Sequence, residues 1–343
     1  MIRVETNFTA VLILAVCLGC GSTPPGQAVQ PQAKQEEAQL DPQLQVTVTS
    51  SADGSAQPAI FWMPPGAAAA ESSPPVPLVV FLHSWSTDLM TSGPALHESQ
   101  NRGWVFVGPN FRGPNNQPEA CASDLAVQDV LDSVEYAKQH ARVDEERVYL
   151  VGGSGGGFMS LLMASRSPQL WDAVSAWVPI SDLTAWHAFS RQEGNQYAGM
   201  MEACFGGPPD TPERAAEYKR RSPLFILAQA KGIPLAIDAG LRDGHDGASV
   251  PLSNTLRAFN ELAKANGHED KMLSEDDIQV LTREARIPGH LAREKEEEPG
   301  RAQAVLFRRY AGPVRLTVFD GGHSVDMPAA FHWLDALQTA PSR

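Results

Sequence analysis

A single serine set among glycines constrains this 343-residue chain more than any other feature. Gly152-Gly153-Ser154-Gly155-Gly156 follows the short apolar run 147–151, which is typical of a buried strand, and leads into a second apolar stretch typical of a helix. Glycine tolerates backbone conformations that other residues avoid and lets neighbouring segments approach closely. The sequence therefore predicts a sharp strand-to-helix bend at residue 154, which presents one hydroxyl.

Strand-like and helix-like segments alternate along most of the chain. Besides 147–151, buried strands are expected at Leu78–Leu82, Trp104–Pro109, Ala173–Val178, Pro234–Gly240 and Arg315–Phe319, and helices at Asp124–Ala141 and Leu252–Gly267. Apolar strands that alternate with helices predict a mostly parallel, doubly wound α/β sheet covered on both faces. Two more strictly alternating runs, Leu44–Ser50 and Ala59–Pro64, suit an antiparallel pair at the edge of the sheet.

The first 42 residues are expected to lie outside the folded domain. Residues 1–20 combine Arg3, a short apolar run and Cys20, the pattern of a signal peptide of the lipoprotein type, in which Cys20 becomes lipidated. Plain secretion and an uncleaved N-terminal helix are the alternatives. Residues 21–42 are rich in Pro and Gln and predict a disordered tether. We therefore expect an exported protein, either anchored to a membrane or free in the periplasm or outside the cell.

Within the predicted domain, residues 43–343, two stretches interrupt the strand–helix alternation. Residues 183–229 follow a strand end, where ligand-facing caps occur in open α/β sheets, and predict a cap-like insertion. Residues 268–312 are strongly charged and predict a solvated surface insertion. Cys121 and Cys204 lie in the exported part, where a disulfide between them is favoured and two buried thiols are the alternative.

Charge excludes one class of partner. Forty acidic and 27 basic side chains give a net charge of −13, so the basic surface of a nucleic-acid-binding protein is absent. A membrane contact is expected only through the N-terminal anchor.

The glycine-flanked serine predicts nucleophilic catalysis. Gly-x-Ser-x-Gly between a strand and a helix is the pattern of a nucleophile elbow, whereas a phosphate-binding loop would need a lysine that is missing here. A serine needs a base and an acid that orients the base. His323 follows the last predicted strand, and Asp243 follows the strand at 234–240, with Asp246 as the alternative acid. Asp243, His245 and Asp246 are too few ligands for a metal site, so neither a metal nor another cofactor is expected.

Two backbone N–H groups are needed to bind the developing oxyanion. Gly155 supplies one because it follows the nucleophile. The second is expected from the loop after the strand 78–82, from Trp85 or alternatively from Ser84. Arg112 and Trp186 are candidates for substrate binding, although Arg112 can equally brace its own loop and tryptophans are more often buried.

With these residues in place, the chain resembles the α/β-hydrolase superfamily, and within it the prolyl oligopeptidase family and its single-domain esterase relatives. The resemblance covers about Pro77 to Leu337 and is carried by LVVFLHSWS, NFRG, RVYLVGGSGGGFM, GLRDGHDGASVP and FDGGHS. It implies Ser154, Asp243 and His323 as the catalytic triad. The chain departs from the family in a longer loop between Asp243 and Val250-Pro251, and in His-Ser-Trp where His-Gly-Gly is usual.

The expected function is that of a secreted or lipid-anchored serine hydrolase that cleaves carboxylic esters through an acyl-enzyme, with carbohydrate-linked esters as one substrate class. About forty residues between the tether and the core are too few for the β-propeller of the family's peptidases, which favours an esterase. A peptidase acting on short peptides is the first alternative. An inactive surface lipoprotein on a hydrolase scaffold is the second.

Overall fold

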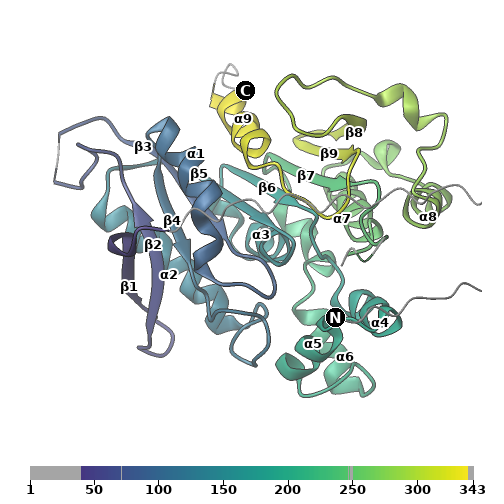
Figure 1. Cartoon of the computed structure of the whole chain (residues 1–343), viewed down its shortest axis with the longest axis horizontal. Coiled ribbons are helices and arrows are strands. Elements are labelled where there is room, and N and C mark those ends of the chain that lie inside the picture. The colour runs from purple at the N-terminus through teal and green to yellow at the C-terminus, as the bar shows by residue number, and fades with distance from the viewer. Residues whose placement is uncertain (1–39, 71, 246, 248–249, 339–343) are drawn as a thin grey trace, which may run out of the picture. The chain divides into compact units, whose positions relative to one another are not determined.

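A nine-stranded sheet runs through the part of the chain that the computed structural model describes (Figure 1). Its order is β1-β2-β4-β3-β5-β6-β7-β9-β8. The strands are β1 (Gln45–Thr49), β2 (Ala56–Trp62), β3 (Val76–Leu82), β4 (Val105–Pro109), β5 (Val143–Gly153), β6 (Ala173–Trp177), β7 (Leu235–Gly240), β8 (Val305–Ala311) and β9 (Val314–Phe319). The central strands β4, β3, β5, β6, β7 and β9 are parallel, whereas β1, β2 and β8 pair antiparallel at the two edges. This topology confirms the predicted α/β-hydrolase fold.

The structure describes residues 40–338 except 71, 246 and 248–249. The predicted signal peptide with Cys20, most of the predicted tether and the alternative acid Asp246 lie outside the described residues. The described part belongs to one unit, Glu37–Arg343. None of its helices is both long enough and apolar enough to cross a membrane.

Helices cover the sheet on both faces. They are α1 (Gly93–Arg102), α2 (Asp124–His140), α3 (Gly155–Arg166), α7 (Ser253–Ala265) and α9 (Met327–Gln338). Right-handed crossovers place α1 on one face and α2, α3 and α7 on the other, because the chain first steps to β4 and then reverses toward β9. Helix α9 packs against α1. The central strands are buried on both sides, as the completely buried Leu78, Val79 and Val80 of β3 show.

The helices begin and end where local chemistry dictates. Ser123 caps α2 by accepting a hydrogen bond from Ala126 N at 3.0 Å. Gly103 ends α1 in the left-handed conformation, with φ of 66°. Short 3-10 helices occupy several connections: η1 (Pro42–Leu44), η2 (Leu89–Ser92), η3 (Pro168–Leu170), η4 (Pro223–Phe225), η5 (Leu227–Ala230), η6 (Glu269–Lys271) and η7 (Leu291–Glu294).

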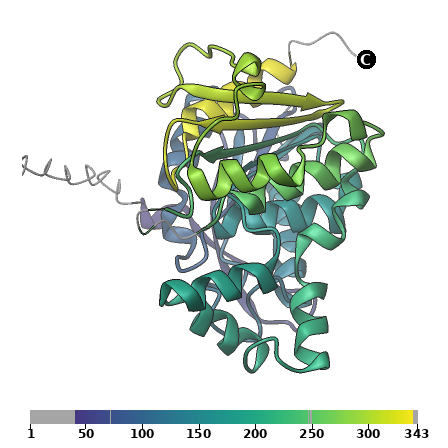
Figure 2. The same ribbon diagram turned by 90° about the vertical axis from the view of Figure 1, so that its right-hand side faces the viewer.

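The first predicted insertion folds as three helices between β6 and β7. They are α4 (Leu183–Glu193), α5 (Tyr197–Phe205) and α6 (Pro212–Arg220), and Figure 2 shows them in teal, grouped together in the lower part of the view. Asp182 caps α4 by accepting from Thr184 N and Ala185 N. The cap-like role of this insertion stays a prediction.

The second predicted insertion is not a solvated surface segment throughout. It contains α8 (Glu275–Glu284) and the edge strand β8, in which Val305 and Phe307 are buried. The Arg301 side chain is only 1% exposed. The expectation for 268–312 was wrong in this respect, because charged side chains that find buried partners can enter a protein interior.

Candidate active site

Ser154 sits at the sharp bend between β5 and α3. Its backbone angles, φ 56° and ψ −117°, lie outside the conformations that side chains favour. Ser154 N donates to the Trp177 carbonyl on the neighbouring strand β6 at 2.9 Å, which helps to hold the bend. The flanking positions must be glycine because a side chain there would clash with neighbouring backbone atoms. A Cβ at Gly152 would lie 2.4 Å from the Gly156 carbonyl, and one at Gly156 would lie 2.0 Å from the Leu82 oxygen.

The structure brings the three predicted triad residues together at the carboxyl ends of the strands. His323 Nε2 lies 2.8 Å from Ser154 Oγ. On the other side of the ring, His323 Nδ1 lies 2.9 Å and 3.0 Å from the two Asp243 carboxylate oxygens. The residues come from three loops, after β5, β7 and β9, and are separated by up to 169 positions in the sequence. An imidazole between a hydroxyl and a carboxylate is the arrangement that activates a serine nucleophile.

The environments of Asp243 and His323 differ in their access to water. Asp243 is 1% exposed, whereas the His323 side chain is 20% exposed. Burial raises the pKa of the Asp243 carboxyl, while hydrogen bonds from His323 and from the N–H groups of Gly244 and Val250 oppose that rise. The buried carboxylate thus depends on its neighbours, which also fix the direction of the imidazole.

The predicted oxyanion donors, Trp85 and Gly155, lie side by side. A Cβ at Gly155 would be 2.3 Å from Trp85 N, so the two backbones touch. Gly155 is the first residue of α3, where the N–H has no carbonyl partner within the helix. Trp85, not the alternative Ser84, supplies the backbone nitrogen nearest to that position.

His83 was not singled out from the sequence, yet it anchors the loop that carries Trp85. Its buried ring lies between two carbonyls, with Nδ1 2.9 Å from Ser84 O and Nε2 2.9 Å from Asn110 O. The ring also stacks on Phe111 at 3.9 Å. Burial lowers the pKa of His83 below its usual range. Its place directly after β3 was the only available signal.

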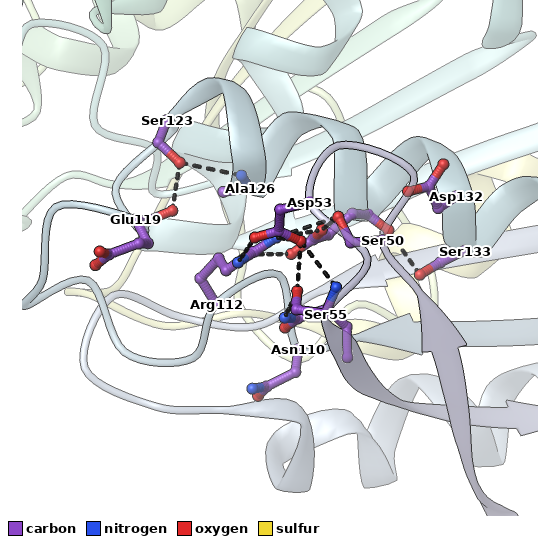
Figure 3. Close-up of polar contacts among 12 residues, drawn as sticks. Ser50, Asp53, Ser55, Asn110, Arg112, Glu119, Ser123, Ala126, Asp132 and Ser133 are labelled. Carbon is purple, nitrogen blue, oxygen red and sulfur yellow. Dashed lines mark hydrogen bonds and ion pairs between the residues drawn. The ribbon is translucent and has the colours of Figure 1, made fainter.

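Arg112 braces its own loop and is not available to a substrate (Figure 3). Its Nε donates to Asp129 at 2.6 Å, its Nη1 donates to Asp53 at 2.8 Å and its Nη2 donates to Ser50 at 3.1 Å. The side chain is 8% exposed. These contacts join the β1–β2 turn to α2. They correct the assignment of Arg112 to substrate binding, because its fork of donors is occupied by two carboxylates.

Trp186 is likewise packed inside the protein. It is 1% exposed and lies edge-on to Trp85, with 4.7 Å between ring centroids, and beside Tyr197 at 5.1 Å. A side chain with so little accessible surface offers no face on which a sugar or another substrate group could stack. The structure therefore assigns Trp186 to the packing of helix α4 against Trp85 and corrects its assignment to substrate binding.

Cys121 and Cys204 are buried free thiols that lie within hydrogen-bonding reach of each other. Burial raises the pKa of the Cys121 thiol, and a hydrogen bond with the Cys204 thiol raises it further. Both cysteines are free thiols in this structure, and the disulfide between them stays a prediction. The structure also brings together the two sulfurs that the predicted disulfide would join.

The fold and the triad geometry define an α/β-hydrolase with a serine nucleophile. The sequence profile of the prolyl oligopeptidase family matches residues 86–279, which is more than half of the chain. The chain therefore belongs to the prolyl oligopeptidase family. The matched residues include Ser154 and Asp243, and the structure adds His323 from beyond them.

Curated relatives share part of the chain. Dipeptidyl aminopeptidase BIII of Pseudoxanthomonas mexicana is 28% identical over 180 residues, which are 49% of this chain and 26% of that protein. Acylamino-acid-releasing enzyme 2 of rice (Oryza sativa subsp. japonica) is 23% identical over 52% of this chain and 24% of its own length. The chain thus spans about a quarter of the length of these two relatives.

Solved structures share the fold. The acylaminoacyl peptidase of Pyrococcus horikoshii superimposes with a TM-score of 0.53 and 16% identity, covering 86% of this chain and 40% of that one. A puromycin-hydrolyzing peptidase of Mycobacterium tuberculosis gives a TM-score of 0.56 and 19% identity, covering 85% of this chain and 38% of that one. These likenesses show the α/β-hydrolase fold, and the family match makes the protein a serine hydrolase of the prolyl oligopeptidase family.

Proposed function

We propose that this serine hydrolase is a peptidase that acts on short peptides or on amino-acid amides. The observation that carries the proposal is the triad geometry, Ser154 Oγ to His323 Nε2 at 2.8 Å, in a chain of this family. The two curated relatives are named a dipeptidyl aminopeptidase and an acylamino-acid-releasing enzyme, which supports amide substrates over the esters that the sequence favoured.

The chemistry follows from the placement of the donors and acceptors. His323 Nε2 takes the proton of Ser154 Oγ as the oxygen attacks the substrate carbonyl. Asp243 accepts the hydrogen bond from Nδ1 and stabilises the imidazolium. The N–H groups of Trp85 and Gly155 bind the oxyanion. Each such donor typically raises the rate by ~100-fold or more. His323 then protonates the leaving amine. In the second half of the reaction His323 takes a proton from water, which attacks the acyl-enzyme and releases the acid as Ser154 regains its proton.

Ester hydrolysis is the second candidate. The same acyl-enzyme serves both reactions, and an alkoxide leaves with less help from His323 than an amine does. Among the described residues, η1 and the strands β1 and β2 precede β3. Small esters are therefore substrates to be compared with peptides on equal terms.

The test compares both substrate classes on one preparation. Wild-type protein, Ser154→Ala and the control Ser72→Ala, which changes an exposed loop serine, are assayed with aminoacyl and dipeptidyl p-nitroanilides and with p-nitrophenyl esters. The proposal predicts anilide cleavage by the wild type and Ser72→Ala and none by Ser154→Ala. Ester turnover without amide cleavage would favour the esterase. Failure of a fluorophosphonate probe to label Ser154 would favour the inactive scaffold.

We also propose, from residues 1–20 alone, that the chain is exported and lipidated at Cys20. The short apolar run ahead of the cysteine supports this assignment. Intact mass measurement of the protein from membranes should give a chain that begins at Cys20 and carries acyl groups, and Cys20→Ser should abolish the added mass. A soluble chain cleaved elsewhere would indicate plain secretion.

A further inference from the structure

The charged segment 296–304, called the strap, contacts the strands β6, β7 and β9 through the side chain of Arg301. Arg301 Nη2 donates to Asp238 Oδ1 of β7 at 2.9 Å, and Arg301 Nη1 lies 3.0 Å from Glu298 Oε2. The guanidinium also lies over the rings of Trp177 and Phe319, at 4.7 Å and 5.5 Å from their centroids. Those rings belong to the last residues of β6 and β9, so one side chain contacts three neighbouring strands.

The Arg301–Asp238 ion pair is completely desolvated. The exposed fractions of the two side chains are 1% and 0%. Asp238 Oδ2 has no hydrogen-bond partner in the described part of the chain, since Arg315 Nη2 is 3.5 Å away. Arg301 is therefore the main partner of this buried carboxylate. A buried ion pair contributes little net stability compared with apolar residues, which points to a role in fixing geometry.

The strap in turn holds the loop that carries His323. Ala302 N donates to Asp326 Oδ2 at 2.7 Å, and Asp326 Oδ1 accepts from Ala329 N at the start of α9. At the other end of the loop, Asp320 N donates to Ala304 O at 2.9 Å. The loop 320–326 is thus fastened to the strap on both sides of the histidine.

The same contacts reach the nucleophile. The carbonyl of Trp177, whose ring lies under Arg301, accepts the hydrogen bond from Ser154 N. Asp238 lies two residues before Gly240, the last residue of the strand that leads to Asp243. Arg301 is therefore linked to the segments of all three triad members. Trp177 links it to Ser154, Asp238 links it to the strand before Asp243, and the strap links it to the loop that carries His323.

We propose that Arg301 is a positioning residue for His323. It fixes the strap over β6, β7 and β9, and the strap holds the loop 320–326 at the distance at which the imidazole meets Ser154. The inference rests on the proposed serine hydrolysis. Lysine cannot replace Arg301 fully, because an ammonium lacks the fork of donors with which the guanidinium contacts two carboxylates at once beside the two rings.

The test uses variants that separate position from stability. Arg301→Met removes the clamp and leaves the buried Asp238 carboxylate only the 3.5 Å contact with Arg315, whereas Asp238→Asn/Arg301→Met removes the carboxylate together with the clamp and should recover part of the lost stability. Arg309→Met is the matched control. Arg309 is also a largely buried arginine of this insertion, but it pairs with Glu294 through Nη2 and Nε and makes no contact with the strap's partners Asp238 or Asp326.

Two rates are measured on each folded variant: labelling of Ser154 by a fluorophosphonate, and kcat and KM for p-nitrophenyl acetate. The double variant should label and turn over about 10- to 100-fold more slowly with little change in KM, the effect of a displaced catalytic group. Arg301→Lys should fall between the double variant and the wild type, and Arg309→Met should match the wild type.

A folded double variant with wild-type labelling and kcat would overturn the inference while leaving the proposed function intact. A rise in KM at unchanged kcat would also overturn it, because that result assigns Arg301 to substrate binding. Failure of the wild type to be labelled would instead overturn the proposed function, and with it the inference.

Discussion

Replacing Gly155 by alanine should separate the two oxyanion donors. The new Cβ would lie 2.3 Å from Trp85 N and 2.4 Å from Trp85 Cα, and ordinary contact begins at 3.4 Å. Both contacts are backbone atoms, so no side chain can rotate away. The Trp85 loop must therefore move by about 1 Å, and a shift of that size in a catalytic group costs roughly 100-fold in rate.

The magnitude agrees with the loss of one oxyanion donor. Such donors bind at about 2.7–3.1 Å, and removing one lowers kcat by about 100- to 1,000-fold, or about 2.7–4 kcal/mol. The expected change is therefore a fall of that size in kcat, with KM for p-nitrophenyl acetate changed by less than about 3-fold, because the donors act on the transition state.

Gly199→Ala is the control, since nothing lies within 4 Å of its Cβ position in helix α5. That variant should keep full activity and melt at the same temperature or slightly higher, because alanine is the better helix former. Circular dichroism verifies that both variants are folded. A folded Gly155→Ala protein with kcat within about 3-fold of the wild type would refute the assignment of Trp85 and Gly155 as donors.

Three further predictions concern stability and redox state. Arg112→Ala should destabilise the protein by about 3 kcal/mol in urea unfolding, because it leaves the 1%-exposed Asp129 carboxylate unpaired, and should leave KM unchanged; a raised KM would restore a substrate role. Arg220 and Arg221 hold the pKa of Glu217 at about 2, below its usual 4.5, so Glu217→Gln should lower the melting temperature at pH 7 slightly. That difference should shrink as pH falls from 4.5 toward 2, where the wild-type carboxyl takes up its proton; a difference that persists at pH 2 would contradict the assignment. Mild oxidation should join Cys121 to Cys204 with the loss of two hydrogens by mass and, in the chain-entropy model, an added stability on the order of 4 kcal/mol; two alkylated cysteines after oxidation would contradict this.

Local patterns made the nucleophile predictable. The glycines around Ser154 are needed because the backbones of Gly156 and Leu82 approach closely. The strand before them and the helix after them are recognisable in the sequence from about twenty residues. The loop that carries Asp243 and the loop that carries His323 were also predictable, because parallel strands end at one edge of the sheet. The central strands could be recognised because their apolar runs are buried on both faces.

The errors arose where a side chain's partner lies far away in the sequence. Arg112 meets Asp53 across 59 positions and Arg301 meets Asp238 across 63, so their burial could not be inferred from their own polar surroundings. A cluster of glutamates and arginines indicates a solvated surface only when its members find no buried partners. The burial of Trp186 likewise depends on Trp85, which is about a hundred residues away in the sequence.

The central claim is that Ser154, His323 and Asp243 act as one unit. Fluorophosphonate labelling followed by peptide mass spectrometry tests it most directly, with wild-type protein, His323→Ala and Asp243→Asn compared at equal concentration. The account predicts a single adduct on Ser154 in the wild type, none within the same time in His323→Ala, and much slower labelling in Asp243→Asn. An adduct on another residue, or labelling of Ser154 at the wild-type rate without the imidazole, would contradict it.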